Sequence, residues 1–124
     1  MTITLRGVPP SLNRFAGRKN VNAYRTEKDR WTRAVYYTAR AAKDRPAEPY
    51  QRAEVSIKYY FPDKRRRDPD NYCGKMLMDG LTKAGIIQDD DMAHITLTIS
   101  GAVDRASPRT EITVKEETWT TTTT

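Results

Sequence analysis

Cysteine and histidine are nearly missing from this chain: it has one of each, Cys73 and His94, among 124 residues. A lone cysteine excludes an intramolecular disulfide. One cysteine and one histidine are also too few for a structural zinc site, which takes four such ligands. Because the single histidine gives no convincing Cys–His pair, we expect Cys73 to be a small buried residue and not a nucleophile.

Long apolar runs and internal repeats are missing too. No N-terminal stretch resembles a signal peptide, and no stretch approaches the roughly 20 apolar residues of a membrane-spanning helix. We therefore expect a soluble, cytoplasmic protein with no membrane partner.

Positive charge is what the chain has in excess. It carries 22 Lys and Arg against 16 Asp and Glu, a formal net charge of +6. Such a balance favours a polyanionic partner, nucleic acid above all. The length predicts a single domain over residues 1–117, followed by a threonine-rich tail, 118–124, that has no packing pattern and is expected to be disordered.

Alternation of apolar and polar residues predicts four strands. It is clearest over 52–61, where the apolar side chains fall on one side and the polar ones on the other. Similar alternation predicts strands over 2–6 and 93–100, and a further strand around Ile112 and Val114.

Helical spacing predicts a first helix from about Thr26 to Lys43. Thr26 and Asp29 have a spacing like that of a capping box, and the apolar residues after them recur at helical intervals. Pro46 would keep the helix from continuing.

A second helix is predicted from Pro69 to Ala84. Asp68 suits its N-cap, Pro69 its first position and Gly85 its end. The element order β-α-β-α-β-β describes an α/β (α+β) fold, with a small mixed sheet of about four strands and two helices packed on one face.

A run of cations directly beside carboxylates is the most informative feature. The run is Lys64, Arg65, Arg66 and Arg67, then Asp68 and Asp70, with Asp89, Asp90 and Asp91 after the second predicted helix. Grouped carboxylates repel one another unless a divalent cation or a basic group offsets their charge. The pattern is what a metal-dependent enzyme on a polyanion needs.

Each carboxylate also has a structural interpretation. Asp68 is explained as a helix cap, Asp70 by the preference of a carboxylate for the first turn, and 89–91 as a solvated acidic turn. An EF-hand loop is excluded because Cys73 occupies the position that needs glycine. If the helix of 69–84 is straight, about 20 Å separates the two acidic groups, so the sequence leaves their contact open.

Two segments carry a family resemblance. Residues 8–14 read Val-Pro-Pro-Ser-Leu-Asn-Arg, and residues 65–90 contain Arg-Arg-Arg-Asp-Pro-Asp-Asn and, later, Met-Asp-Gly-Leu-Thr-Lys-Ala-Gly-Ile-Ile-Gln-Asp-Asp. Together they resemble the RusA family of Holliday junction resolvases, mostly of phage and prophage origin.

The resemblance implies a homodimeric, Mg²⁺-dependent endonuclease that resolves four-way DNA junctions by paired symmetric nicks, in recombination and repair. The family's catalytic aspartates fall on Asp68, Asp70 and Asp90, which would also hold Mg²⁺, or Mn²⁺ as a substitute. No organic cofactor is implied. Which subunit supplies each carboxylate stays open.

The active-site lysine of the family falls on Lys75, one residue further from Asp70 than in the best-known members, because Gly74 is extra. In a helix, one added residue rotates all later side chains by about 100°, so the assignment of Lys75 stays open, as does the role of Asp79.

Predicted DNA contacts are Lys64, Arg65, Arg66, Arg67, Asn71, Asn13 and Arg14. Two other functions remain open on the sequence. A non-catalytic nucleic-acid-binding module would use the same cations, and a metal-dependent nuclease of flap or duplex DNA would use the same aspartates.

Overall fold

The structure, a computed structural model, describes residues 1–17 and 20–117. The predicted tail, 118–124, lies outside the described residues. In chain order the elements are β1 (Thr2–Arg6), η1 (Leu12–Phe15), α1 (Val21–Ala41), β2 (Ala53–Phe61), η3 (Pro69–Asn71), α2 (Met78–Lys83), β3 (Ile95–Val103) and β4 (Arg109–Glu116), where η is a 3₁₀ helix.

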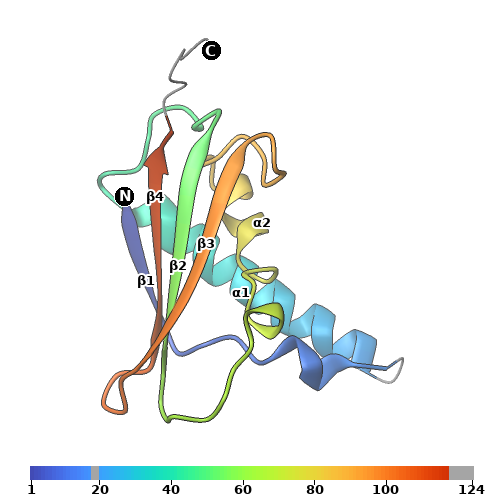
Figure 1. Cartoon of the computed structure of the whole chain (residues 1–124). Helices are drawn as coiled ribbons and strands as arrows, with labels where there is room; N and C mark the ends of the chain where they lie inside the picture. The colour runs from blue at the N-terminus through green and yellow to red at the C-terminus, as the bar shows by residue number, and fades with distance from the viewer. Residues whose placement is uncertain (18–19, 118–124) are drawn as a thin grey trace, which may run out of the picture.

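One mixed sheet organises the molecule. Its strand order is β1-β4-β2-β3, with β2 and β3 parallel and the other neighbours antiparallel. The parallel pair needs a crossover, and the segment that carries η3 and α2 provides it. Both α-helices lie on one face of the sheet (Figure 1). The predicted fold class is therefore confirmed.

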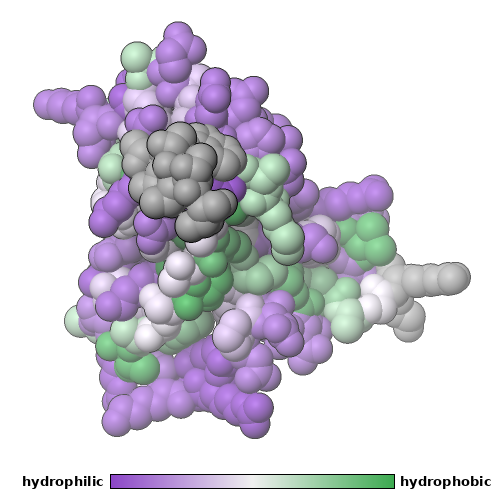
Figure 2. Space-filling model, turned by 45° about the horizontal axis from the view of Figure 1, so that its top comes forward, coloured by the Kyte–Doolittle hydropathy of each residue, from purple (hydrophilic) through white to green (hydrophobic). Residues whose placement is uncertain are grey.

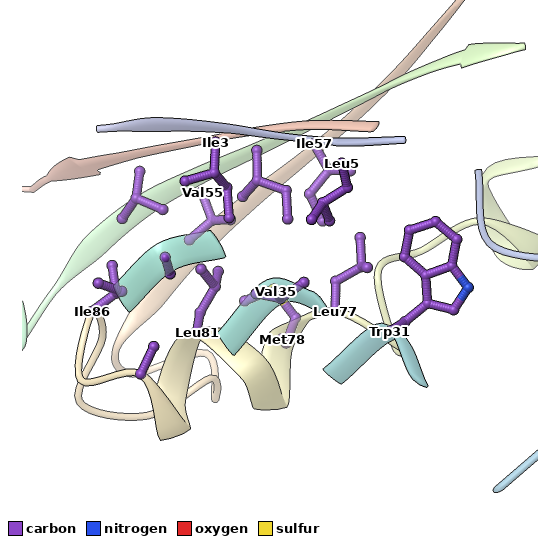
Figure 3. Close-up of a cluster of buried hydrophobic side chains, with 14 of the residues drawn as sticks. Ile3, Leu5, Trp31, Val35, Val55, Ile57, Leu77, Met78, Leu81 and Ile86 are labelled. Atoms are coloured by element: carbon purple, nitrogen blue, oxygen red, sulfur yellow. The ribbon is translucent and has the colours of Figure 1, made fainter. Parts of the chain in front are cut away.

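The core fills the space between this face of the sheet and the helices. Side chains from the strands, such as Val55 and Ile57, point toward Val35 on α1 and Leu81 on α2 (Figure 3). All four are at most 1% exposed. Burial of one such side chain stabilises a fold by about 1.5–3 kcal/mol, so this layer fixes α1 and α2 on the sheet.

The predicted bounds of the first helix are wrong. The helix begins at Val21 and ends at Ala41. Thr26 is no cap, because its hydroxyl donates to the carbonyl of Asn22 at 2.9 Å inside the helix. Threonine satisfies its hydroxyl in this way within helices, so cap-like spacing did not mark the helix start.

The second predicted helix is also wrong over most of its length. Only Met78–Lys83 is α-helical, and η3 is a separate turn. Gly74 lies between them with φ +83°, and a Cβ there would come within 2.6 Å of the Ile57 Cδ1. A residue with a positive φ cannot continue a right-handed helix, so Gly74 separates η3 from α2. The distance of about 20 Å along a straight helix therefore does not apply.

Gly85 ends α2 with φ +77°, as predicted. The third strand is Ile95–Val103 and not 93–100, because the carbonyl of Asp91 first accepts turn hydrogen bonds from the backbone of His94 and Ile95. Cys73 is half-buried, not buried. Within residues 1–17 and 20–117, no helix combines the length and the apolar character needed to cross a bilayer.

Candidate functional site

Hydrophilic side chains cover most of the face drawn in Figure 2, and hydrophobic residues show mainly across its middle. Apart from Arg14 in η1 and Lys75 between η3 and α2, the charged residues singled out by the sequence fall into three places in the structure. These are the loop from Asp63 to Asn71, the contact between α1 and α2, and the turn before β3.

Arg67 braces the loop that leaves β2. Its guanidinium donates to the Asp63 carboxylate at 2.7 Å and to the carbonyls of Asp63 and Arg65 at 2.7 and 3.0 Å. It also lies 4.3 Å from the ring centroid of Phe61, and only 16% of its side chain is exposed. Arg67 thus ties the loop to the end of β2.

Arg65 and Arg66 point outward instead. Their side chains are 84% and 89% exposed and pair with Asp63 at 3.2 Å and with Asp68 at 3.3 Å. A hydrogen bond from the Arg65 backbone is the main cause that lowers the pKa of Asp63. Surface ion pairs are weak, so both arginines can exchange their partners for a phosphate. Lys64 is exposed as well.

Asp68 and Asp70 are both exposed on the short turn of η3. Asp68 occupies the N-cap position with Pro69 after it, as predicted, but its carboxylate makes no capping hydrogen bond. It accepts from Arg66 instead. The capping interpretation of Asp68 therefore lacks its hydrogen bond, and the carboxylate faces the cation run.

The first motif segment lies beside the second. η1, which carries Asn13 and Arg14, contacts η3, which ends at Asn71. Both η1 residues are exposed, and Figure 1 shows η1 beside the N-terminal end of α1. The fold thus brings together two segments that are far apart in the sequence.

Lys75 faces the first helix. Its Nζ lies 5.9 Å from the ring centroid of Tyr24 on α1, within cation–π range. The Tyr24 ring also packs edge-on against Phe15, at 5.7 Å between centroids. Lys75 is exposed, so its ammonium lies at the boundary between α1 and solvent.

A close helix crossing builds an acidic cluster that the sequence did not reveal. At Gly80, a Cβ would come within 2.7 Å of the Thr32 carbonyl, so only glycine lets α2 approach α1 this closely. The neighbouring Asp79 then pairs with Lys28 at 3.1 Å. That hydrogen bond is the main cause that raises the pKa of Lys28, and the charge of Asp90 adds to it.

Asp90 completes this Lys28 cluster, which we define as Lys28, Asp79 and Asp90. Desolvation by the surrounding protein is the main cause that raises the pKa of Asp90, followed by its hydrogen bond with Asp89 and the charge of Asp79. Lys28 was missed in the sequence. The one signal for it was Gly80 within an apolar helical stripe, which indicates close backbone approach.

The turn before β3 holds another group. One ligand atom each from Asp89, Asp91 and His94 lies within 4.8 Å of the others. Asp91 and His94 form a hydrogen-bonded pair, which is the main cause that lowers the pKa of Asp91.

The three predicted metal ligands are not gathered in this way. Over the described ranges 1–17 and 20–117, no such group of three contains Asp68, Asp70 and Asp90. Asp68 lines a cavity with Ser100, whereas the turn holding Asp90 enters β3 at Ile95. Ser100 and Ile95 are five residues apart along β3, which is about 16 Å at about 3.3 Å per residue.

An exposed acidic turn thus lies beside the exposed Arg65 and Arg66, next to one end of a small mixed sheet. The sequence matches the family of the endodeoxyribonuclease RusA over residues 7–115. The chain therefore belongs to this family, as the motif resemblance indicated. Membership implies a metal-dependent nuclease that acts on branched DNA. A search of curated proteins found no match.

Proposed function

We propose that the protein is a Mg²⁺-dependent, structure-selective endonuclease that resolves four-way DNA junctions by paired symmetric nicks, in recombination and repair. It would act in the cytoplasm of a bacterial or phage-infected cell. The observation that supports this most is the contact of η1 with η3, beside the exposed Arg65 and Arg66. Both motifs of the family thus contribute to one surface.

The carboxylates suit Mg²⁺ by their chemistry. All three candidate ligands, Asp68, Asp70 and Asp90, offer oxygen atoms and are exposed. Mg²⁺ keeps several waters and often takes only one or two protein carboxylates directly, so the three need not touch. Desolvation is the main cause that raises the pKa of Asp90, and the hydrogen bond with Asp89 and the charge of Asp79 add to it, so a bound cation would offset the electrostatic part. Mn²⁺ would serve as a substitute.

A bound Mg²⁺ supplies a water of lowered pKa and charge stabilisation at the phosphate. The chain's own residues would stabilise charge and hold the DNA. Lys75 would stabilise the charge that develops on the scissile phosphate or its leaving oxygen. The residues proposed to hold the DNA backbone are Lys64, Arg65, Arg66, Asn71, Asn13 and Arg14. Arg67 would support them by fixing the loop.

Paired nicks imply two active sites. A two-fold homodimer presents the same site twice, related by the symmetry that the four-way junction itself has. Contacts to the DNA backbone carry no sequence information. Selection of a junction would therefore depend on the spacing of the two sites and on DNA shape.

The test is cleavage of a labelled mobile four-way junction and of matched flap and linear duplexes, each with Mg²⁺, with Mn²⁺ and with EDTA. We expect paired nicks in the junction only, and none with EDTA. Cleavage of flap or duplex at the same rate would indicate a different nuclease. Tight binding without cleavage of any substrate would indicate a non-catalytic binding module. Asp70→Asn is the matched control for contaminating nuclease.

A further inference from the structure

A small cavity opens beside Asp68, between the η3 turn and β3. Its volume is about 80 Å³, whereas about 10–15 Å³ on the same measure holds one water. The residues that matter for its shape are Phe61, Arg67, Asp68, Tyr72, Ile99 and Gly101. The cavity therefore has room for a group of several heavy atoms.

The walls are aromatic and preformed. Phe61 and Tyr72 meet edge to face, with ring centroids 5.1 Å apart, and Tyr72 also packs on Tyr59 at 5.9 Å. Tyr59 is only 2% exposed. Arg67 covers Phe61 and is held by its hydrogen bonds to the loop. These contacts leave little freedom to the walls, so the cavity does not depend on a ligand to form.

Gly101 keeps one side of the cavity open. A Cβ at this position would lie 3.1 Å from the Phe61 Cε2, closer than most Cβ contacts allow. Strand interiors disfavour glycine unless a backbone or ligand approaches closely. The backbone of β3 here approaches the Phe61 ring, beside the space that the cavity occupies.

We propose that this cavity binds one unstacked nucleobase of the DNA, next to the scissile phosphate. The inference rests on the proposed function and adds a contact that reads the base. Next to the scissile phosphate, DNA presents either its polar sugar–phosphate backbone or a flat base with π faces. Aromatic walls suit the base, because every base has a π face that can stack on an aromatic ring.

The position of Asp68 indicates which base of the DNA would enter the cavity. Asp68 belongs both to the cavity and to the proposed metal ligands, so a phosphate at those ligands places its neighbouring base near the cavity. Branch points supply such bases, because stacking is interrupted there and unstacking is easier. The enzyme would therefore prefer certain bases at one position beside the cut, in addition to the junction shape.

The experiment uses 2-aminopurine, a base analogue whose emission changes when it leaves the stack. It replaces, in turn, each base around the crossover of a four-way junction, and a linear duplex of the same sequence serves as control. Measurements are made with the full chain in Ca²⁺, a cation that also takes oxygen ligands but is expected to support cleavage poorly, and are repeated in EDTA as the metal-free control. Binding is followed separately by fluorescence anisotropy.

Tyr72→Leu removes an aromatic wall, and Tyr37→Leu is the matched control, since Tyr37 is 69% exposed on α1. Gly101→Ala is a second variant that narrows the cavity by one methyl group. Circular dichroism confirms that each variant is folded. If Tyr72→Leu fails to fold, Gly101→Ala carries the comparison.

We expect an emission change at one position in the junction, present with wild type and Tyr37→Leu and abolished in the cavity variants. Junction affinity should fall about fivefold or more in Tyr72→Leu, as for removal of one stacked base. Junction binding with no emission change at any position, or a change that survives in the cavity variants, would overturn the base site alone. Absence of junction binding by wild type would overturn the proposed function as well.

Discussion

The two acidic regions of the molecule are built in opposite ways. Asp68 and Asp70 lie on an exposed turn, and Arg66, which pairs with Asp68, is itself 89% exposed. In the Lys28 cluster, Asp79 is held by a lysine at 3.1 Å, where α2 crosses α1. The ion pair of the first region, between Arg66 and Asp68, is largely exposed to solvent, whereas the pair of Lys28 and Asp79 in the second is less exposed.

The largest expected effect separates cleavage from binding in the exposed turn. Asp70→Asn should lower junction cleavage about 100-fold or more, as expected when a group that stabilises the transition state is removed. Binding should stay within a few-fold or improve, because a charge that repels phosphate is gone. The melting temperature should not change. Single-turnover cleavage and anisotropy on the same junction measure both, and parallel loss of binding would contradict the assignment.

The next comparison divides the cation run. Arg65→Ala with Arg66→Ala should weaken junction and duplex binding alike and reduce the salt dependence by up to about 0.9 log unit for each phosphate that the protein no longer neutralises. Arg67→Ala should instead lower the melting temperature by several degrees, because it removes the brace of the loop. Affinity at several salt concentrations and thermal unfolding measure the two effects. Equal salt slopes for the two variants would contradict the division.

Asp90→Asn should raise stability while it abolishes cleavage. The pKa of Asp90 is raised in the fold, so the folded state favours the protonated carboxyl and its ionisation at neutral pH destabilises the protein. The variant should therefore melt higher at pH 7, and its advantage should shrink as the pH falls toward about 4. Thermal unfolding across this range checks the sign. A lower melting temperature at pH 7 would refute it.

The smallest effect is expected for Lys28→Met. Its ion pair with Asp79 is partly exposed, so the destabilisation should be less than about 1 kcal/mol. Because the pKa of Lys28 is raised in the fold, the stabilisation is complete below the unfolded value of 10.5 and disappears as the pH rises through the folded value. Urea unfolding at pH 7 and near pH 11 tests this, with Lys28→Arg as the charge-retaining control.

Much of the sheet could be predicted from the sequence, but the segments that connect its strands to the helices could not. Alternation identified β2 because one of its faces is buried and the other is not. Gly74 breaks the helix through its positive φ, and its backbone packs closely against the Ile57 side chain of β2, a contact that no local pattern reports. Reliance on spacing alone therefore extended a short turn into a long helix.

The candidate site divides in the same way. The two motif segments could be recognised because their residues are close in sequence, and the structure places them side by side. Lys28 could not, because its role depends on a helix crossing far along the chain. Whether Asp90 lies close to the exposed turn likewise depends on tertiary geometry, and among the described residues the three predicted ligands do not form one close group.

The most direct test is Mg²⁺ affinity, measured by NMR titration of backbone amides in wild type, in the exposed-turn variant Asp70→Asn and in Asp79→Asn, each of which removes one negative charge. A purely electrostatic effect therefore weakens binding in both. We predict that the exposed-turn variant loses Mg²⁺ affinity about tenfold or more and that Asp79→Asn stays close to wild type. Equal loss of Mg²⁺ affinity in the two variants, or no Mg²⁺-dependent shift at the exposed turn in wild type, would contradict the assignment of the Mg²⁺ site to the exposed turn.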